Sequence, residues 1–261
     1  MIETNRLNTK KVLNLISRKN IERIFLDVDH TIIATDRGME ATIPMLNKIY
    51  PKLGETTNSI HEIIHNAKAD FEGMKLNEQK KYLDLVKYFE EVQNNFSKKW
   101  GLKMWSRETI IMKAAEDLGL KLTVRQVVDI AQKYWEIVSK FAGYYEDAIP
   151  FLKKIKNEKI PIFWVTGSDS LLRLSRDKKK LVYDPKYSKQ KKQERLKKLV
   201  SDYPGKLIIG DPIDKPKIWE KVFDKWVINN TNKLLAVGNS YDTDLKVAEE
   251  LRIKTILITR K

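Results

Sequence analysis

The stretch Ile24-Phe25-Leu26-Asp27-Val28-Asp29-His30-Thr31 constrains the fold more than any other part of the chain. Its apolar residues favour a buried strand, and two carboxylates and a hydroxyl follow. Carboxylates are rarely buried without partners, so we expect the strand to end here. Open α/β sheets bind ligands beyond the carboxyl ends of their strands, which makes Asp27, Asp29 and Thr31 candidate site residues. A polar strand-to-turn cap without chemistry is the alternative.

Further strand-like apolar segments lie in the second half of the chain, with helical patterns between them. They span residues 160–165, 206–210, 234–237 and 255–258. Strands that alternate with helices predict βαβ units and a parallel sheet. The expected fold class is therefore α/β, with a Rossmann-like parallel sheet as the core.

A long helical block separates the first strand from the second. Residues 78–99 have apolar side chains at helical spacing, and Ser106 is a candidate N-cap for a helix over 107–118. Thr123 and Gln126 form a capping box at the start of a third helix. The block predicts an inserted all-helical cap domain. We expect this domain to span residues 37–145 and the core to comprise 1–36 and 146–261.

Polar residues follow three of the later strands. The carboxyl ends of parallel strands lie at one edge of a sheet, so these residues can converge despite long sequence gaps. Thr166 and the Gly167 amide would donate to a phosphoryl oxygen, and Lys215 would supply positive charge. Asn239 and Asp244 would complete an oxygen shell around Mg²⁺. Donors and a metal ion in one pocket are what phosphoryl transfer requires.

In order and spacing these motifs resemble those of the haloacid dehalogenase (HAD) superfamily, and specifically its phosphatase branch. The likeness covers residues 24–258. The matching positions, in chain order, are Asp27 to Thr31, then Thr166, then Lys215 with Lys217 as a rival, then Gly238-Asn239-Ser240 with Asp244. The helical block follows the first motif, where the family has a cap.

The resemblance implies a Mg²⁺-dependent hydrolase of a small phosphorylated metabolite or nucleotide. Asp27 would attack phosphorus and form an aspartyl-phosphate, and Asp29 would act as general acid and then as general base. Mg²⁺ would be held by Asp27, Asp29, Asn239 and Asp244. One departure is Asn239, where aspartate is usual, which removes one negative charge from the metal site. Asp29 favours phosphate chemistry, because the carbon–halogen-cleaving members lack this acid.

Charge and composition suggest what surrounds the protein. The chain has no cysteine and no apolar stretch of membrane-spanning length, which fits a cytoplasmic protein without a membrane partner. Its net charge is +15, and twelve basic residues oppose three acids between Arg173 and Lys198. This segment is either a solvated helix-and-loop face or a landing surface for a polyanion. If the segment binds a polyanion, the alternative function is that of a nucleic-acid-binding protein with a phosphatase fold and little enzymatic activity.

A competing motif lies in the helical block. His61-Glu62-Ile63-Ile64-His65 matches the HExxH pattern of zinc metalloproteases, and its histidines share one helix face. A catalytic zinc needs a third protein ligand. Glu78 or Glu90 could serve, but no sequence motif singles out either of them. Zinc proteolysis is therefore the less favoured alternative.

Overall fold

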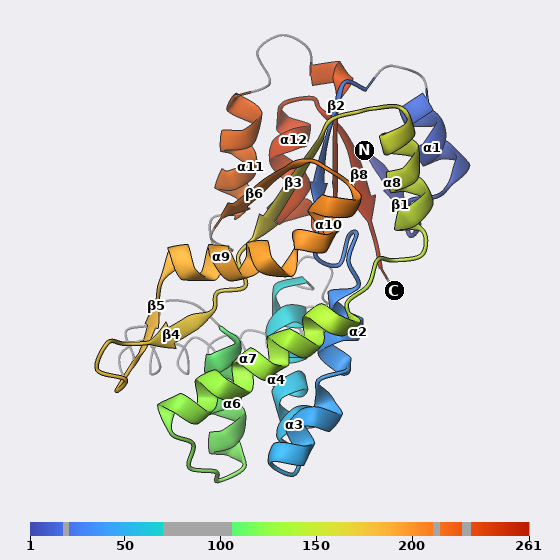
Figure 1. Ribbon diagram of the computed structural model, residues 1–261. Coiled ribbons are helices and arrows are strands. Elements are labelled where there is room, and N and C mark those ends of the chain that lie inside the picture. Colours follow the sequence, from blue (N-terminus) through green and yellow to red (C-terminus); the bar gives the residue numbers. More distant parts are fainter. Residues whose placement is uncertain (18–20, 70–105, 211–214, 226–230, 261) are drawn as a thin grey trace, which may run out of the picture. The chain divides into compact units, whose positions relative to one another are not determined.

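The chain forms two compact units in the described residues (Figure 1). The computed structural model describes residues 1–17, 21–69, 106–210, 215–225 and 231–260, apart from the side chains of 63–69. We call residues 1–36, 142–169 and 189–261 the core unit. We call residues 37–141 and 170–188 the second unit.

A parallel sheet forms the centre of the core unit. Its six strands in the described residues are β1 (Ile2–Thr4), β2 (Arg23–Asp27), β3 (Ile162–Gly167), β6 (Lys206–Gly210), β7 (Leu234–Gly238) and β8 (Lys254–Ile258). They lie in the order β1-β8-β7-β2-β3-β6. The chain moves outward from β2 through β3 to β6 and then crosses to β7 on the other side of β2. The topological switch point, where open α/β sheets bind ligands, therefore lies beside β2.

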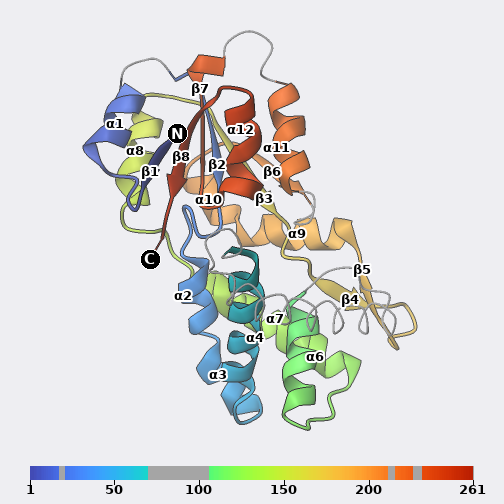
Figure 2. The ribbon, with the colours of Figure 1, turned by 180° about the vertical axis from the view of Figure 1, so that it is seen from behind.

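Helices cover both faces of this sheet (Figure 2). Those of the core unit are α1 (Lys10–Ser17), α8 (Ala148–Asn157), α10 (Lys197–Asp202), α11 (Lys215–Asp224) and α12 (Lys246–Glu250). A 3₁₀ turn, η2 (Thr231–Lys233), precedes β7, and a π-helical turn, η3 (Tyr241–Leu245), precedes α12. Helices α2 (Thr35–Glu40) and α9 (Pro185–Arg195) each contain residues of both units.

Alternate residues of β2 account for the two layers of core. Ile24 and Leu26 pack in one apolar cluster with residues of α1 and α8, whereas Phe25 packs in the other with Trp219 and Phe223 of α11. Successive side chains of a strand point to opposite faces, so a strand buried on both sides is a continuous apolar run. The predicted α/β fold with a Rossmann-like parallel sheet is confirmed.

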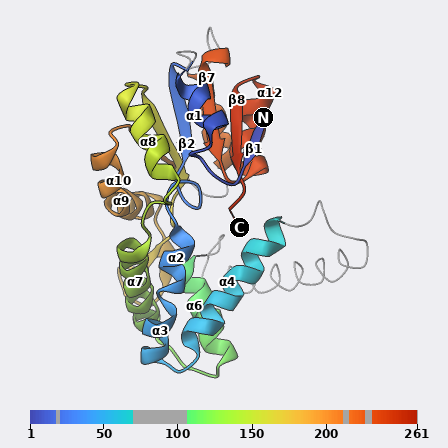
Figure 3. The same cartoon turned by 90° about the vertical axis from the view of Figure 1, so that its right-hand side faces the viewer.

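Helices build most of the second unit (Figure 3), and one hairpin lies with them (Figure 1). Its other elements are α3 (Ile43–Ile49), α4 (Leu53–Ala69), α6 (Arg107–Asp117), α7 (Val124–Phe141), β4 (Leu172–Leu174) and β5 (Leu181–Tyr183). Ser106 caps α6, because its Oγ accepts from the Thr109 amide at 3.1 Å. The Thr123 amide donates to Gln126 Oε1 at 2.8 Å before α7. Both predicted caps are confirmed, whereas the predicted helix 78–99 lies outside the described residues.

The unit boundaries differ from the predicted domains in two places. Residues 142–145 belong to the core unit, because the Ala34 amide donates to the Gly143 carbonyl and the Tyr145 amide to that of Ile32. Residues 170–188 belong to the second unit, where the antiparallel strands β4 and β5 pack Leu172 and Leu181 against Val127 of α7. The second unit is therefore not all-helical. None of the described helices combines the length and apolar character needed to span a bilayer.

Candidate active site at the carboxyl ends of the strands

The loop after β2 brings polar groups back to the end of that strand. Asp27 ends β2 and is 1% exposed. His30 has a left-handed backbone conformation, with a φ of 58°, and this reverses the chain. The amides of Ile32 and Ile33 then donate to the Val28 carbonyl, which closes the loop. As a result Thr31 Oγ1 donates to Asp27 Oδ2 at 2.7 Å.

One lysine joins the ends of two strands. Lys215 Nζ, from the first residue of α11, lies 2.8 Å from Asp27 Oδ1 and 2.7 Å from Asp244 Oδ1. Asp244 lies in the turn η3 after β7 and is also buried. Gly238 ends β7 with no side chain, and a Cβ there would lie 2.7 Å from Asp244 Oδ2. We call Asp27, Thr31, Lys215 and Asp244 the Asp27 cluster.

Burial and charge compete within the Asp27 cluster. Burial is the main reason that the pKa of Asp27 is raised to about 7. The positive charge of Lys215 lowers this pKa, but the like charge of Asp244 raises it again and partly offsets the lysine. Burial alone would lower the pKa of Lys215, but the two carboxylates raise it well above its usual value. The lysine is therefore an ammonium ion shared by two buried carboxylates, and the cluster carries excess negative charge when both are ionised.

These residues fit a divalent cation. Hard cations take carboxylate and amide oxygens, and the excess negative charge of the Asp27 cluster is what such an ion would neutralise. Thr31 Oγ1 lies 3.2 Å from Asn239 Oδ1 as well as contacting Asp27, so the amide oxygen of Asn239 adjoins the same cluster. Of the four predicted ligands, the structure thus brings Asp27, Asn239 and Asp244 together.

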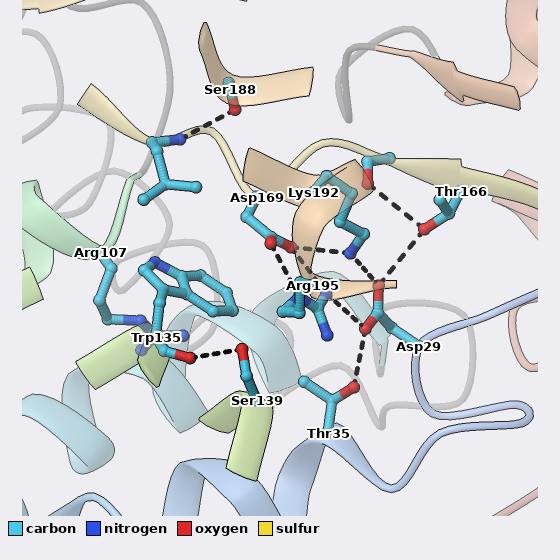
Figure 4. Close-up of polar contacts among 12 residues, drawn as sticks. Asp29, Thr35, Arg107, Trp135, Ser139, Thr166, Asp169, Ser188, Lys192 and Arg195 are labelled. Carbon is cyan, nitrogen blue, oxygen red and sulfur yellow. Dashed lines mark hydrogen bonds and ion pairs between the residues drawn. The ribbon is translucent and has the colours of Figure 1, made fainter. Parts of the chain in front are cut away.

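The fourth predicted ligand, Asp29, makes a separate set of contacts (Figure 4). Its Oδ1 accepts from Thr35 Oγ1 at 2.7 Å and from Arg195 Nη2 at 2.9 Å. Its Oδ2 accepts from Lys192 Nζ and, at 3.3 Å, from Thr166 Oγ1. The structure therefore does not bring the Asp29 carboxylate together with the other three predicted ligands. It places Asp29 beside Thr166, as the converging strand ends predicted.

Two cations decide the ionisation of Asp29. Burial alone would raise its pKa, but Arg195 and Lys192 outweigh this effect and hold the pKa well below its usual range. Asp169 contacts the same two cations, and the pKa of Arg195 is raised above its usual value because both carboxylates face it. We call Asp29, Asp169, Lys192 and Arg195 the Asp29 cluster.

The remaining predicted residues lie at the same edge of the sheet. Thr166 and Gly167 end β3, where Val165 is the register partner of Asp27. Thr166 is 1% exposed, so its hydroxyl is inside the site. Lys217, the rival of Lys215, is exposed on α11. The structure therefore places Lys215, the residue in the Lys-Pro pair, beside Asp27.

The sequence motifs did not identify three residues of the Asp29 cluster. Lys192 and Arg195 lie within the basic segment 173–198, and Asp169 lies three residues after Thr166. Their side chains are 1%, 5% and 6% exposed respectively. The spacing i, i+3 places Lys192 and Arg195 on one helix face. Nothing else in a lysine-rich helix distinguishes them from their exposed neighbours.

The described residues of the zinc motif do not form a metal site. Glu62 is exposed and accepts from Asn58 Nδ2 at 2.7 Å. The His65 side chain and both candidate third ligands, Glu78 and Glu90, lie outside the described part of the chain. Among the described residues, no three histidine, cysteine or acidic side chains form a group that could hold a metal ion. The magnesium set above depends on the Asn239 amide for its third oxygen.

Comparison with solved structures identifies the class of fold. The chain is similar to YfnB from Bacillus subtilis, named as a HAD-hydrolase and solved with magnesium bound, with a TM-score of 0.51 and 13% identity over 91% of this chain and 86% of that one. The fold is therefore that of the HAD superfamily hydrolases, as the motifs predicted.

Two further similar structures have lower scores. A HAD phosphatase from Thermococcus onnurineus has a TM-score of 0.45 and 16% identity, over 92% of this chain and 87% of that one. L-2-haloacid dehalogenase from Xanthobacter autotrophicus has a TM-score of 0.47 and 12% identity, over 92% and 78%. No protein-family model and no curated protein sequence matches the chain.

Proposed function

We propose that this protein is a Mg²⁺-dependent phosphomonoester hydrolase that forms an aspartyl-phosphate on Asp27. The observation that carries the proposal is the buried carboxylate of Asp27 at the switch point, with Lys215 Nζ 2.8 Å away and the Thr31 hydroxyl 2.7 Å away. A carboxylate can act as a nucleophile towards phosphorus, and adjacent donors and cations stabilise the charge that develops there. The substrate class is a small phosphorylated metabolite or nucleotide.

Asp27, Asn239 and Asp244 would hold Mg²⁺ through oxygen atoms. The ion would supply positive charge that polarises the phosphoryl group. Lys215 lies between Asp27 and Asp244 and keeps one ammonium charge beside the reacting carboxylate. The Thr166 hydroxyl and the Gly167 amide at the end of β3 would bind phosphoryl oxygens. Buried donors that are already in place cost little reorganisation during the reaction.

Asp29 would transfer protons in both half-reactions. In the first, the Asp27 carboxylate bonds to phosphorus, the ester P–O bond breaks, and the leaving oxygen takes a proton from Asp29. In the second, a water molecule bonds to phosphorus and gives a proton to Asp29, and the bond between phosphorus and the Asp27 oxygen breaks. This step releases phosphate and restores the Asp27 carboxylate. The low pKa of Asp29 favours its role as base. The first half-reaction is more demanding, because Asp29 must then carry a proton beside two cations.

A phosphatase assay tests the proposal. We expect release of phosphate from p-nitrophenyl phosphate with Mg²⁺ and its loss with EDTA. Asp27→Asn removes the nucleophile and should lower kcat by about three orders of magnitude or more. Asp224→Asn, an exposed carboxylate at the end of α11, is the matched control and should keep full activity. Full activity of Asp27→Asn would refute the assignment. Chloride release from a 2-haloacid without phosphatase activity would favour dehalogenation instead.

A further inference from the structure

Helix α9 brings two buried cations to the site. Lys192 and Arg195 are one turn apart near the carboxyl end of α9, and their side chains are 1% and 5% exposed. Buried lysine and arginine side chains are rare unless they are paired. Lys191, the neighbour of Lys192, instead lies at the surface and pairs with Glu194 at 2.8 Å. The two inward residues thus differ in environment from the rest of the basic helix.

Asp169 holds both cations in place. Its Oδ1 lies 2.7 Å from Lys192 Nζ and 2.8 Å from Arg195 Nη2, and its Oδ2 accepts from Arg195 Nε at 2.9 Å. Long cationic side chains have several rotatable bonds and lose conformational freedom when they are ordered. A fixed carboxylate partner that accepts charge-assisted hydrogen bonds limits where these side chains can point. The Asp29 cluster contains two carboxylates and two cations and is electrically balanced. It therefore needs no further ion to be stable.

The same two cations orient Asp29. Each Asp29 oxygen accepts from one cation and one threonine hydroxyl, so all four contacts are donors and they surround the carboxylate. The longest is the 3.3 Å contact from Thr166 Oγ1. If Thr166 turns to a phosphoryl oxygen, Lys192, Arg195 and Thr35 still hold the carboxylate. One acceptor position on Oδ2 then becomes available for the transferred proton.

We infer that Lys192 and Arg195, themselves fixed by Asp169, are positioning residues that orient the Asp29 carboxylate for proton transfer at the leaving oxygen. This inference rests on the proposed function. It also assigns a role in the site to the end of a basic helix that the sequence presents only as surface charge. The three residues act through Asp29, so their removal should affect both of its proton transfers, and kcat/KM measures the first, in which Asp29 supplies a proton. Removing a cation by itself makes Asp29 easier to protonate, so a loss in this step reports the orientation of the carboxyl group.

Leaving-group dependence tests this inference. An alkyl phosphate releases a basic alkoxide that requires protonation, whereas 2,4-dinitrophenyl phosphate releases a weakly basic phenolate that does not. General acid catalysis contributes about 10²–10⁴-fold. For Lys192→Met we expect kcat/KM to fall about 10²-fold or more with glycerol 1-phosphate and less than about 10-fold with the dinitrophenyl ester. Asp169→Asn should show the same pattern with a smaller loss.

Two further variants complete the experiment. Lys191→Met changes the neighbouring, partly exposed lysine, which pairs with Glu194 and not with Asp29, and should leave both rates unchanged. Lys192→Arg keeps the charge and should recover part of the alkyl phosphate activity. If Lys192→Met does not fold, as judged by circular dichroism, Asp169→Asn and Lys192→Arg provide the comparison.

The outcomes separate this inference from the proposed function. Equal losses with both esters, or no loss with either, would overturn the positioning role while leaving the phosphatase intact. A wild-type protein that hydrolyses neither ester with Mg²⁺, or an active Asp27→Asn variant, would overturn the proposed function and the inference together. A loss confined to the alkyl ester in Lys192→Met, with Lys191→Met unaffected, supports the inference.

Discussion

The core unit and the second unit both bury carboxylates, but they surround them with different numbers of cations. Asp29 faces two cations, and its pKa lies well below the usual range. Asp27 shares one lysine with Asp244, and its pKa is raised to about 7, mainly by burial. Glu108 in α6 of the second unit has a pKa raised to about 7, also by burial, with Arg107 only a weak opposing influence.

These three acids show how nearby cations oppose the effect of burial on the ionisation of a carboxyl group. Burial disfavours the charged form, and each cation within reach opposes that penalty. Two cations outweigh burial at Asp29, whereas one shared cation does not at Asp27. Arg107 places its guanidinium over the Tyr134 ring, 4.4 Å from the centroid, and its charge is the smallest of the influences that lower the pKa of Glu108. The core unit can thus keep Asp29 ionised beside a site that still attracts a cation.

Removing the shared lysine should have the largest effect on stability. Lys215→Met leaves Asp27 and Asp244 buried without their common counter-charge. Breaking a buried ion pair costs about 3–5 kcal/mol, so we expect a loss of this size in the free energy of unfolding in EDTA, together with loss of phosphatase activity. Urea unfolding followed by circular dichroism measures the first effect.

Lys217→Met is the matched control for this variant, because Lys217 lies two residues further along the same helix and is exposed. We expect it to change stability by less than about 0.5 kcal/mol. Equal stability of the two variants in EDTA would show that Lys215 does not neutralise the buried carboxylates.

The acid without a strong cationic partner should make stability depend on pH. Glu108 is 1% exposed, and its pKa rises from 4.5 to about 7 on folding. Between these values the folded state keeps a proton that the unfolded state releases. The contribution of Glu108 to the free energy of unfolding is therefore fully present below pH 4.5 and is lost as the pH rises to about 7. Two and a half pH units at about 1.36 kcal/mol each amount to about 3 kcal/mol.

Glu108→Gln cannot titrate, so the difference in unfolding free energy between wild type and this variant isolates the effect. Urea unfolding at a series of pH values between 4 and 8 measures it. Glu116→Gln, at an exposed position of the same helix, should keep the wild-type dependence on pH. The same dependence in Glu108→Gln as in wild type would contradict the assignment.

A smaller effect should follow from crowding the Asp27 cluster. In Gly238→Ala the new Cβ would lie 2.6 Å from Asp244 Cβ, which is too close for either residue to stay in place. Overpacking costs about 1–3 kcal/mol, and the displaced Asp244 should weaken phosphatase activity. Gly143→Ala is the control, because a Cβ there meets no atom within 4 Å. Thermal unfolding and steady-state kinetics of the two variants decide the matter. Equal behaviour would mean that Asp244 can move freely.

The strand ends show how far sequence patterns reach. Asp27, Thr166 and Asp244 were predicted to converge because apolar strands and polar tips are local features, and a parallel sheet gathers its carboxyl ends at one edge. The caps at Ser106 and Thr123 were equally local. The hairpin β4–β5 was missed because each strand has only three residues, too few for a pattern of period two.

By itself the sequence determined the sheet, the layers of apolar residues and the residues at the ends of the central strands, since each depends on side chains close together along the chain. Only the tertiary structure decided that Lys192 and Arg195 turn inward to Asp29. It also decided that one lysine serves both Asp27 and Asp244. Burial and charge pairing depend on groups far apart in sequence, so the ionisation of each acid becomes readable only when the fold brings those groups within a few ångströms.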